Sequence, residues 1–273
     1  MADIFGDLNN RKVVRMSHAL NFARYDISIV ALDILYALIS QITKEDKELN
    51  CYHTSVSEFE RLLGRKLNRK SLTSAQHELL TEPIIFMKDK SVDPYAWCKT
   101  FDLNSRLGII KIELHPQLTK HLLQLPKFFV LGSLTEVLKL NSKYSKRMYF
   151  VFAQFVELGS FEMSVGVLRN ILQLPCPDSE EIEYGYFKKR VLAPSVKNIT
   201  DLTTIRVDYS EMKFGRRITD IKFVIYKPKV PKKEKPKKVI GKSGVMAAAE
   251  WVKNENAKDA AIDTEIVTLQ LSS

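Results

Sequence analysis

A nine-residue pattern occurs twice in the chain, 109 residues apart, and it indicates that one module is repeated. Residues 55–63 (SVSEFERLL) align without gaps on residues 164–172 (SVGVLRNIL), and both read S-V-x-x-φ-x-x-φ-L, where φ is apolar. Each copy follows a long amphipathic segment and a short strand pattern, and each precedes a further helix and a hairpin. The nine matching positions are weak evidence by themselves, because many capped amphipathic helices share them. The repeated order of elements favours a tandem duplication of one domain.

The second copy has the more complete pattern. Residues 142–226 predict a long helix, a short strand, a helix over 165–172, a helix over 184–199, and a two-strand hairpin around 213–217. A helix-turn-helix followed by a basic hairpin is the outline of a winged helix, a module that reads DNA. The sequence therefore predicts an α+β fold of two tandem winged-helix domains related by internal duplication.

The first copy follows the same order with weaker signals. Asp26 is expected to cap a long helix over 27–42. Ser55 and Glu58 form a capping box, in which a hydroxyl at the start of a helix and a carboxylate three residues later satisfy unpaired N–H groups. The remaining predicted elements are a strand over 51–54, a helix over 71–80, a hairpin with strands at 95–103 and 107–114, and a helix over 116–125.

The charge is distributed unevenly and suggests how the chain is divided. Of the net charge of +10, residues 227–238 carry +6 and residues 239–273 carry −2, which leaves +6 for the other 226 residues. Three prolines prevent residues 227–238 from forming a continuous helix, so we expect a disordered basic tail that adds non-specific affinity for a polyanion. The expected layout is a flexible arm (1–12), an N-terminal winged-helix domain (13–130), a C-terminal winged-helix domain that does most of the DNA reading (131–226), and a Lys/Pro-rich linker and tail (227–273).

The helix over 184–199 has the two faces that a DNA-reading helix needs. At helical spacing, one face is apolar and the opposite face carries long cationic side chains that can reach guanine edges or phosphates. Pro194 is expected to kink the helix or end its regular part. Gly215 allows a tight turn at the hairpin loop, whose tip is also basic. The candidate DNA-binding residues of this domain are Lys188 (near the buried side and extended toward a phosphate), Lys189, Arg190, Lys197, Lys213, Arg216 and Arg217.

The first domain carries a smaller set of candidate DNA contacts. The helix over 71–80 has a polar face with little charge, so we expect weaker DNA binding here, or a partial role in self-association. The cations precede this helix or lie on the hairpin: Arg65, Lys66, Arg69, Lys70 and Arg106. For the helix over 184–199, a solvated basic face without a DNA role is the alternative.

Several other classes of protein are disfavoured by the composition. The five histidines form neither H-x-H nor H-E-x-x-H, and the three cysteines are widely spaced, so we expect no metal site, no disulfide, no cofactor and no enzyme activity. The start of the chain lacks a signal-peptide pattern, and no apolar run reaches about 18 residues. We therefore expect a cytoplasmic protein with no membrane partner and no small-molecule substrate.

Four motifs together resemble those of the iteron-binding replication initiator (Rep) proteins of theta-replicating bacterial plasmids. The matching segments are 142–149 (SKYSKRMY), 167–172 (VLRNIL), 187–195 (FKKRVLAPS) and 213–217 (KFGRR). The family pattern there is roughly S-x-Y-x-x-R-x-Y, L-R, F-x-x-R-V-L-x-P-A and K-x-G-R. The resemblance covers about residues 10–226. The chain departs from the pattern at Ser195, where Ala is usual, and at Asn198-Ile-Thr200, where Glu-Ile-Asn is usual.

The resemblance implies two tandem winged helices that bind direct repeats at a plasmid origin, help to melt the adjacent duplex, and recruit the host initiator and replicative helicase. It also implies a homodimer through the N-terminal domain that represses its own gene and takes part in copy control. A winged-helix transcription regulator without an origin role remains the alternative, because both need the same groove chemistry. A partner-binding winged helix without DNA would tolerate neutralisation of Lys189, Arg190 and Arg217.

Overall fold

The computed structural model describes most of the chain between residues 13 and 226. The described ranges are 13–43, 45–49, 51–86, 93–104, 108–125, 129–174 and 180–226. The expected arm (1–12), the expected basic tail (227–273) and the candidate DNA contact Arg106 lie outside the described residues. Within the described ranges, no helix is long and apolar enough to span a membrane.

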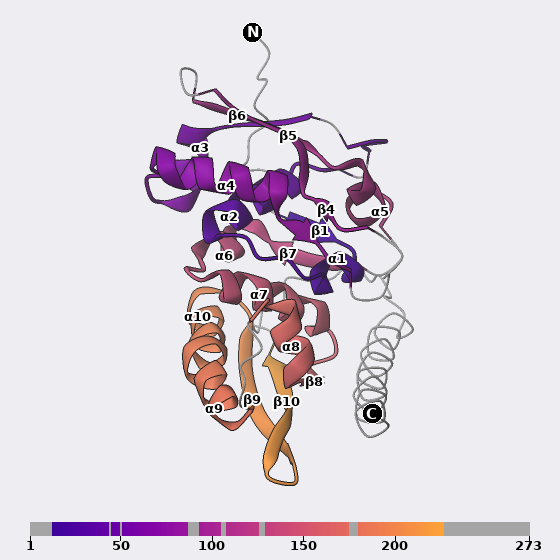
Figure 1. The fold of residues 1–273 in the computed structure, drawn as a ribbon, viewed down its shortest axis with the longest axis vertical. Coiled ribbons are helices and arrows are strands. Elements are labelled where there is room, and N and C mark those ends of the chain that lie inside the picture. Colours follow the sequence, from indigo (N-terminus) through magenta and orange to yellow (C-terminus); the bar gives the residue numbers. More distant parts are fainter. Residues whose placement is uncertain are drawn as a thin grey trace, which may run out of the picture.

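The first half of the described chain is a winged helix with additional elements around it (Figure 1). Its helices are α1 (His18–Phe22), α2 (Ile29–Ile39), α3 (Val56–Leu63), α4 (Arg69–Thr81), the 3-10 turn η1 (Pro116–Leu118), α5 (Thr119–Leu122) and α6 (Leu134–Lys139). Its strands are β1 (Val13–Met16), β2 (Cys51–Ser55), β3 (Pro83–Ile84), β4 (Tyr95–Ala96), β5 (Cys98–Asn104), β6 (Ile109–Leu114) and β7 (Val130–Ser133). The helix-turn-helix is α3 and α4, and the hairpin is β5 and β6.

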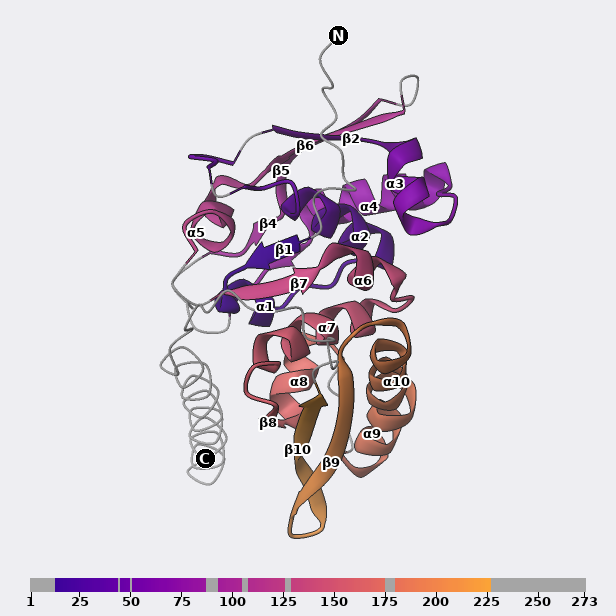
Figure 2. The same cartoon turned by 180° about the vertical axis from the view of Figure 1, so that it is seen from behind.

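The second half is a shorter winged helix that lies below the first in both views (Figures 1 and 2). Its helices are α7 (Lys143–Phe155), α8 (Val165–Ile171), α9 (Glu180–Phe187), the π-helical turn η2 (Lys188–Leu192) and α10 (Ala193–Leu202). Its strands are β8 (Ser160–Ser164), β9 (Arg206–Phe214) and β10 (Arg217–Tyr226). The hairpin of β9 and β10 projects beyond the helices at the lower end of the molecule.

The two halves share one topology, as the repeated pattern predicts. The strand order is β2-β6-β5 in the first half and β8-β10-β9 in the second, with antiparallel pairing throughout. The serine of each repeat starts the following helix, since Oγ of Ser55 accepts a hydrogen bond from the N–H of Glu58 and Oγ of Ser164 from that of Val167, both at 3.1 Å. Each cap satisfies an N–H group that the first helical turn leaves unpaired.

Two expected details of the first domain are wrong. Helix α2 begins after Ser28, whose Oγ accepts a hydrogen bond from the N–H of Ala31 at 3.3 Å, whereas Asp26 forms an ion pair with Lys143. A serine hydroxyl and an aspartate carboxylate cap equally well, so the sequence could not choose between them. The helix expected over 116–125 is the short turn η1 followed by α5, which ends at Leu122.

An unpredicted two-stranded sheet joins the start of the described chain to the segment before α6. Strand β1 pairs antiparallel with β7, from Val13 opposite Ser133 to Met16 opposite Val130. The expected domain boundary between residues 130 and 131 therefore falls inside β7. Four residues are too few to show the two-residue period of a strand, and the partner strand is distant in the sequence.

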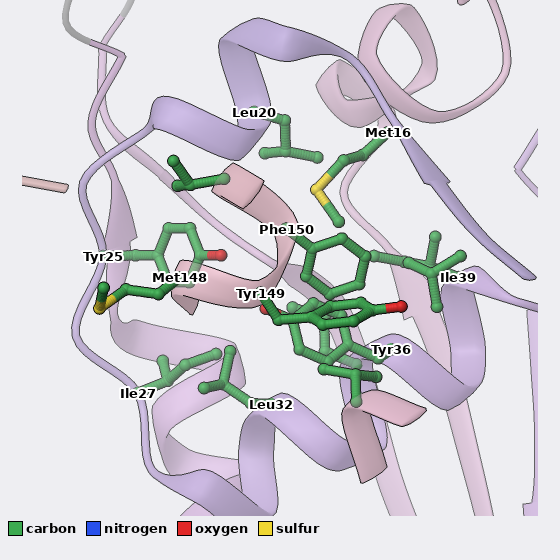
Figure 3. Packing of buried hydrophobic residues seen from close by; sticks show 14 of the residues in the cluster. Met16, Leu20, Tyr25, Ile27, Leu32, Tyr36, Ile39, Met148, Tyr149 and Phe150 are labelled. Atoms are coloured by element: carbon green, nitrogen blue, oxygen red, sulfur yellow. The ribbon is translucent and has the colours of Figure 1, made fainter. Parts of the chain in front are cut away.

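Helix α7 lies between the domains and packs against elements of both, including α1, α2 and β7 of the first and α10 of the second. The sequence predicts one buried face for this segment, but nine of its thirteen residues are buried. The buried hydrophobic residues form one cluster that continues through both domains. Figure 3 shows Tyr149 and Phe150 of α7 packed among Met16, Tyr36 and Ile39 of the first domain.

Polar side chains of α7 also bind the first domain. The Arg147 guanidinium lies 3.6 Å from the centroid of the Tyr25 ring and donates a 2.7 Å hydrogen bond to the backbone oxygen of Ala23. Asn21 donates to Oε1 of Gln154 at 2.9 Å. These contacts give hydrogen-bond partners to polar side chains of α7 that burial has removed from water. They make α7 a shared structural element, which orients the second domain relative to the first.

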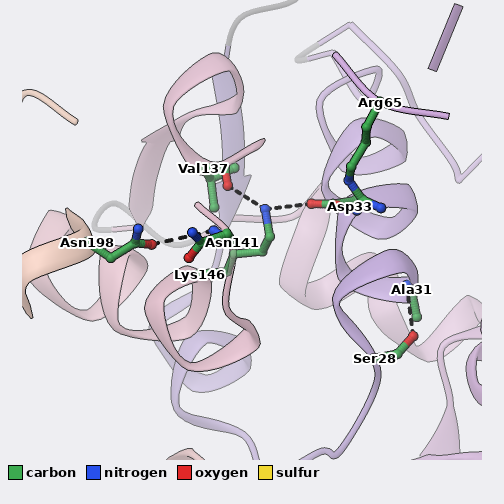
Figure 4. A network of polar contacts seen from close by, with 8 residues as sticks. All are labelled: Ser28, Ala31, Asp33, Arg65, Val137, Asn141, Lys146 and Asn198. Atoms are coloured by element: carbon green, nitrogen blue, oxygen red, sulfur yellow. Dashed lines mark hydrogen bonds and ion pairs between the residues drawn. The ribbon is translucent and has the colours of Figure 1, made fainter. Parts of the chain in front are cut away.

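A buried ion pair lies at the same interface (Figure 4). Nζ of Lys146 is 2.6 Å from Oδ1 of Asp33 on α2, and it donates to the backbone oxygen of Val137 at 2.6 Å. The side chains of Lys146 and Asp33 are 0% and 1% exposed. Nη2 of Arg65 reaches the other carboxylate oxygen of Asp33 at 3.1 Å. Burial raises the pKa of Asp33 and lowers that of Lys146, because both charged forms have lost water.

Gly132 of β7 lets α7 approach the first domain closely. A Cβ atom at this position would lie 2.4 Å from Cε1 of Phe150 and 3.0 Å from Cε1 of Tyr149. We expect Gly132→Ala to lower the free energy of unfolding by about 1–3 kcal/mol, because two buried rings would have to move. Urea unfolding measures this effect.

Gly166→Ala is the matched control for Gly132→Ala. A Cβ on Gly166 of α8 meets only Oγ of Ser164, at 4.0 Å, so this variant should be stabilised by about 0.4–1 kcal/mol through a less flexible unfolded chain. Equal stability of the two variants would show that the α7 rings move aside without a penalty.

Candidate nucleic-acid interface

The predicted reading helix of the second domain is present, but it is interrupted. Helix α9, the turn η2 and helix α10 follow one another without a loop. The N–H of Ala193 bonds to the backbone oxygen of Lys188, five residues back, which is the π-helical pattern. Pro194 has no N–H to donate, and its ring conflicts with the carbonyl four residues before it, so the wider turn lets the chain pass it. This confirms the expected break in regular helix near Pro194.

The division between the two faces of this helix agrees with the prediction. Its buried apolar residues are Phe187, Val191, Leu192, Val196 and Ile199, and the small side chain of Ser195 is buried beside them. Lys189, Arg190 and Lys197 are exposed on the other side. An apolar face that fixes the helix and a cationic face that remains exposed are together what insertion into a major groove requires.

Tyr186 lies on the exposed side of α9 and was not among the predicted contacts. Its side chain is 66% exposed, and the Arg190 guanidinium lies 5.9 Å from the centroid of its ring. Residues four apart on a helix are neighbours, so the ring can hold the guanidinium above the same part of the surface. The i,i+4 spacing of an aromatic and an arginine was a signal for this pair in the sequence.

Lys188 is held by strand β9, one of the two strands (β9 and β10) of the hairpin that forms the wing of this domain. Its Nζ lies 2.6 Å from Oε1 of Glu211, and the Tyr184 hydroxyl donates to the same oxygen at 2.9 Å. The hydrogen bond from Lys188 lowers the pKa of Glu211, and the same bond raises the pKa of Lys188. Lys188 is exposed rather than near the buried side, and in this structure it joins the reading helix to the wing.

Lys197 lies farther along, on α10. Its Nζ pairs with Oδ2 of Asp201 at 2.5 Å, an i,i+4 contact on an exposed helical surface. A surface pair of this kind contributes little stability, so a phosphate can compete for the lysine. The nearby carboxylate nevertheless reduces the positive potential around Lys197 relative to that around Lys189 and Arg190.

The wing of the second domain ends in a basic tip. Phe214 pairs with Arg217, and the two residues between them make the turn, in which Gly215 has a φ of +62°. A residue with a side chain would be strained at this φ, which explains the glycine. The predicted DNA contacts Lys213, Arg216 and Arg217 are all exposed at this tip.

Two of the four described candidate cations of the first domain bind carboxylates of the protein itself. Arg65 binds Asp33, and Nζ of Lys66 binds Oε2 of Glu60 at 2.8 Å. Arg69 and Lys70 are exposed in the first turn of α4. On the polar face of α4, Gln76 donates to the backbone oxygen of Phe101 at 2.8 Å, whereas Ser74 and His77 are exposed. The two domains therefore differ in their exposed cations.

Within the described ranges, no group of three or more histidine, cysteine, aspartate or glutamate side chains is arranged to hold a metal ion. The described residues form two winged helices, with an exposed cationic reading helix and a basic wing in the second domain. That combination defines the class of winged-helix proteins that recognise DNA.

Comparison with known proteins identifies the family. A family model described as initiator replication protein, WH1, matches residues 13–152, and one described as initiator Rep protein, WH2, matches residues 164–225. The chain belongs to the initiator replication (Rep) protein family. The resemblance drawn from the motifs is confirmed, and so is the fold of two winged helices.

Two further similarities agree with this assignment. An uncharacterised 27.6 kDa protein of Escherichia coli is 25% identical over 219 residues, which cover 74% of this chain and 91% of that protein. The crystal structure of the Pi initiator protein in complex with iteron DNA aligns with a TM-score of 0.68 and 17% identity, over 81% of this chain and 99% of that one. At such an identity the structural similarity shows the shared fold.

Proposed function

We propose that this protein initiates plasmid replication by binding direct repeats (iterons) in double-stranded DNA at the origin. The observation that carries the proposal is the exposed group Tyr186, Lys189 and Arg190, on a helix whose opposite face is fixed in the core. An arginine can bind O6 and N7 of guanine through two parallel hydrogen bonds, and a lysine can reach guanine or phosphate. The family and the iteron-bound Pi structure support a replication origin as the site.

The arrangement of the domains supports binding by one monomer along one face of the duplex. The chain carries two winged helices with the same strand order, and the second lies below the first (Figures 1 and 2). The second domain is inferred to read bases, because Lys189 and Arg190 are exposed on its reading helix beside Tyr186. The first domain contributes mainly phosphate contacts, through Arg69 and Lys70 of α4.

Selection of bound duplexes from a random library, at about physiological salt, tests this proposal. We expect a single consensus without a palindrome that spans about two helical turns, since one monomer places two different modules on one DNA face. A palindrome would indicate a dimeric transcription regulator, because the symmetry of the site follows that of the protein. Absence of a consensus would overturn the initiator function.

The proposal extends to self-association and to host proteins. We infer a homodimer through the first domain that represses the protein's own gene, supported by the exposed Leu131 on β7. Sedimentation over a concentration series tests the dimer, and a monomer throughout would contradict it.

A cytoplasmic location and recruitment of the host initiator and replicative helicase follow from the initiator role. Co-purification from plasmid-bearing cells tests the recruitment.

A further inference from the structure

The tip of the second wing carries an apolar side chain that the protein itself leaves in water. Phe214, the last residue of β9, is 82% exposed, the largest fraction among the exposed large hydrophobic side chains of the described residues. Met212 precedes it by two residues and is 39% exposed. Alternate residues of a strand share a face, so the two apolar side chains lie on the same side of the hairpin. Neither contributes to the buried core.

The hairpin carries these side chains away from the domain. Strand β10 pairs with β8 only from Asp220 to Val224, so beyond Asp220 the sheet continues as the two strands β9 and β10 alone. The register shifts between Ile218 and Asp220, which indicates a β-bulge, and bulges increase the local twist of a hairpin. The tip and α9 lie at the same end of the domain (Figures 1 and 2).

The charges around the tip fit a polyanion. Phe214 is flanked by the exposed cations Lys213, Arg216 and Arg217. Two carboxylates lie nearby on the hairpin. Glu211 is held by Lys188 and Tyr184, and Asp220 is half-buried opposite Met212. A partner protein would need a larger apolar surface than two side chains offer, because specific protein interfaces bury about 1,200 Å² or more.

We propose that the tip enters the minor groove of the bound duplex and that Phe214 inserts as an apolar wedge at a base step, which bends the DNA. Phenylalanine and methionine are among the side chains that unstack base steps from the minor groove, and flanking cations hold the phosphates on either side. Pyrimidine–purine steps unstack most easily, so the wedge adds a sequence preference without a hydrogen bond to a base. This inference rests on the proposed DNA binding by the second domain.

Bending of a labelled duplex tests the wedge. The probe is the duplex recovered by selection from a random library, with a donor and an acceptor fluorophore at its two ends. Binding of the unaltered protein should raise energy transfer, and Phe214→Ala should abolish most of that rise and weaken binding about tenfold. Phe214→Leu should retain more than half of the rise, because leucine is also an apolar wedge. Tyr226→Ala removes another exposed ring, at the far end of the same hairpin, and should change neither quantity.

Salt dependence separates the wedge from a charge effect. Phe214→Ala should leave the slope of log affinity against log salt unchanged, whereas Arg216→Ala should reduce its magnitude by about one. If Phe214→Ala binds and bends the duplex like the unaltered protein, the wedge is wrong and the proposed function still stands. If the unaltered protein recovers no duplex from the library, the proposed function fails and the wedge fails with it.

Discussion

Replacing Lys146 with methionine is expected to lower the free energy of unfolding by about 3–5 kcal/mol. The substitution removes the ammonium that lies 2.6 Å from Asp33, and it leaves a carboxylate that is 1% exposed with only the partly exposed Arg65 to neutralise it. A buried charge without its partner is penalised far more than a surface charge. Urea unfolding followed by the fluorescence of the buried Trp97 measures the loss.

The double variant Asp33→Leu/Lys146→Met distinguishes this cause from a simple loss of packing. Burial disfavours the charged forms of both residues, since it raises the pKa of Asp33 and lowers that of Lys146. Removing both charges should therefore restore stability to within about 2 kcal/mol of the unaltered protein, or exceed it. If the double variant is as unstable as Lys146→Met, the buried Asp33 charge is not the cause.

A second ion pair on the same helix provides a matched surface control. Lys143, one turn before Lys146, pairs with Asp26, and these side chains are 32% and 55% exposed. Lys143→Met should change the free energy of unfolding by less than about 1 kcal/mol, because water already screens this pair. A comparable loss in both variants would mean that any cation on α7 matters, whether or not it is buried.

Local features of the fold were predictable because their causes lie within a few residues. The caps at Ser55 and Ser164 each depend on one hydroxyl and the N–H three residues later. The turn at Gly215 depends on its own φ. The buried face of the reading helix follows from helical spacing alone. Each of these signals can be found by inspection of a short window.

Features that depend on distant partners were not predictable in the same way. Strand β1 needs β7, more than 100 residues away, before it becomes a strand. Lys146 occurs in a segment that reads as amphipathic, and only Asp33 on another helix explains why a lysine is buried there. Arg65 is part of a basic turn in the sequence, but the same aspartate binds it.

In the candidate DNA interface too, contacts between distant elements were not predictable from the sequence. The cations of the reading helix and wing could be named from the sequence, but the partner that Glu211 provides for Lys188 could not, because it lies on a different element. Tyr186 and Phe214 were not among the predicted contacts, because that prediction rested on cationic side chains. Their exposure in the structure makes them candidates for the same interface.

Replacing Arg190 with alanine is expected to weaken binding to the selected duplex by about 5–150-fold, or about 1–3 kcal/mol, and to relax the sequence preference at one position. Arg190 is exposed on the reading helix, beside the Tyr186 ring that can hold its guanidinium in one orientation. Alanine removes both donors of a two-bond contact with guanine. Competition binding against duplexes altered at single positions measures the affinity and the preference together.

Arg190→Lys and Lys197→Ala complete the test of base reading. Lysine keeps the charge but not the fork of two donors, so Arg190→Lys should relax the preference while it largely preserves affinity for unrelated DNA. Lys197→Ala should have a smaller effect, because that lysine already pairs with Asp201. An equal loss on every sequence, with a salt slope reduced by about one, would instead assign Arg190 to a phosphate. Base recognition would then fall to Lys189 and Tyr186, the remaining exposed side chains of the group.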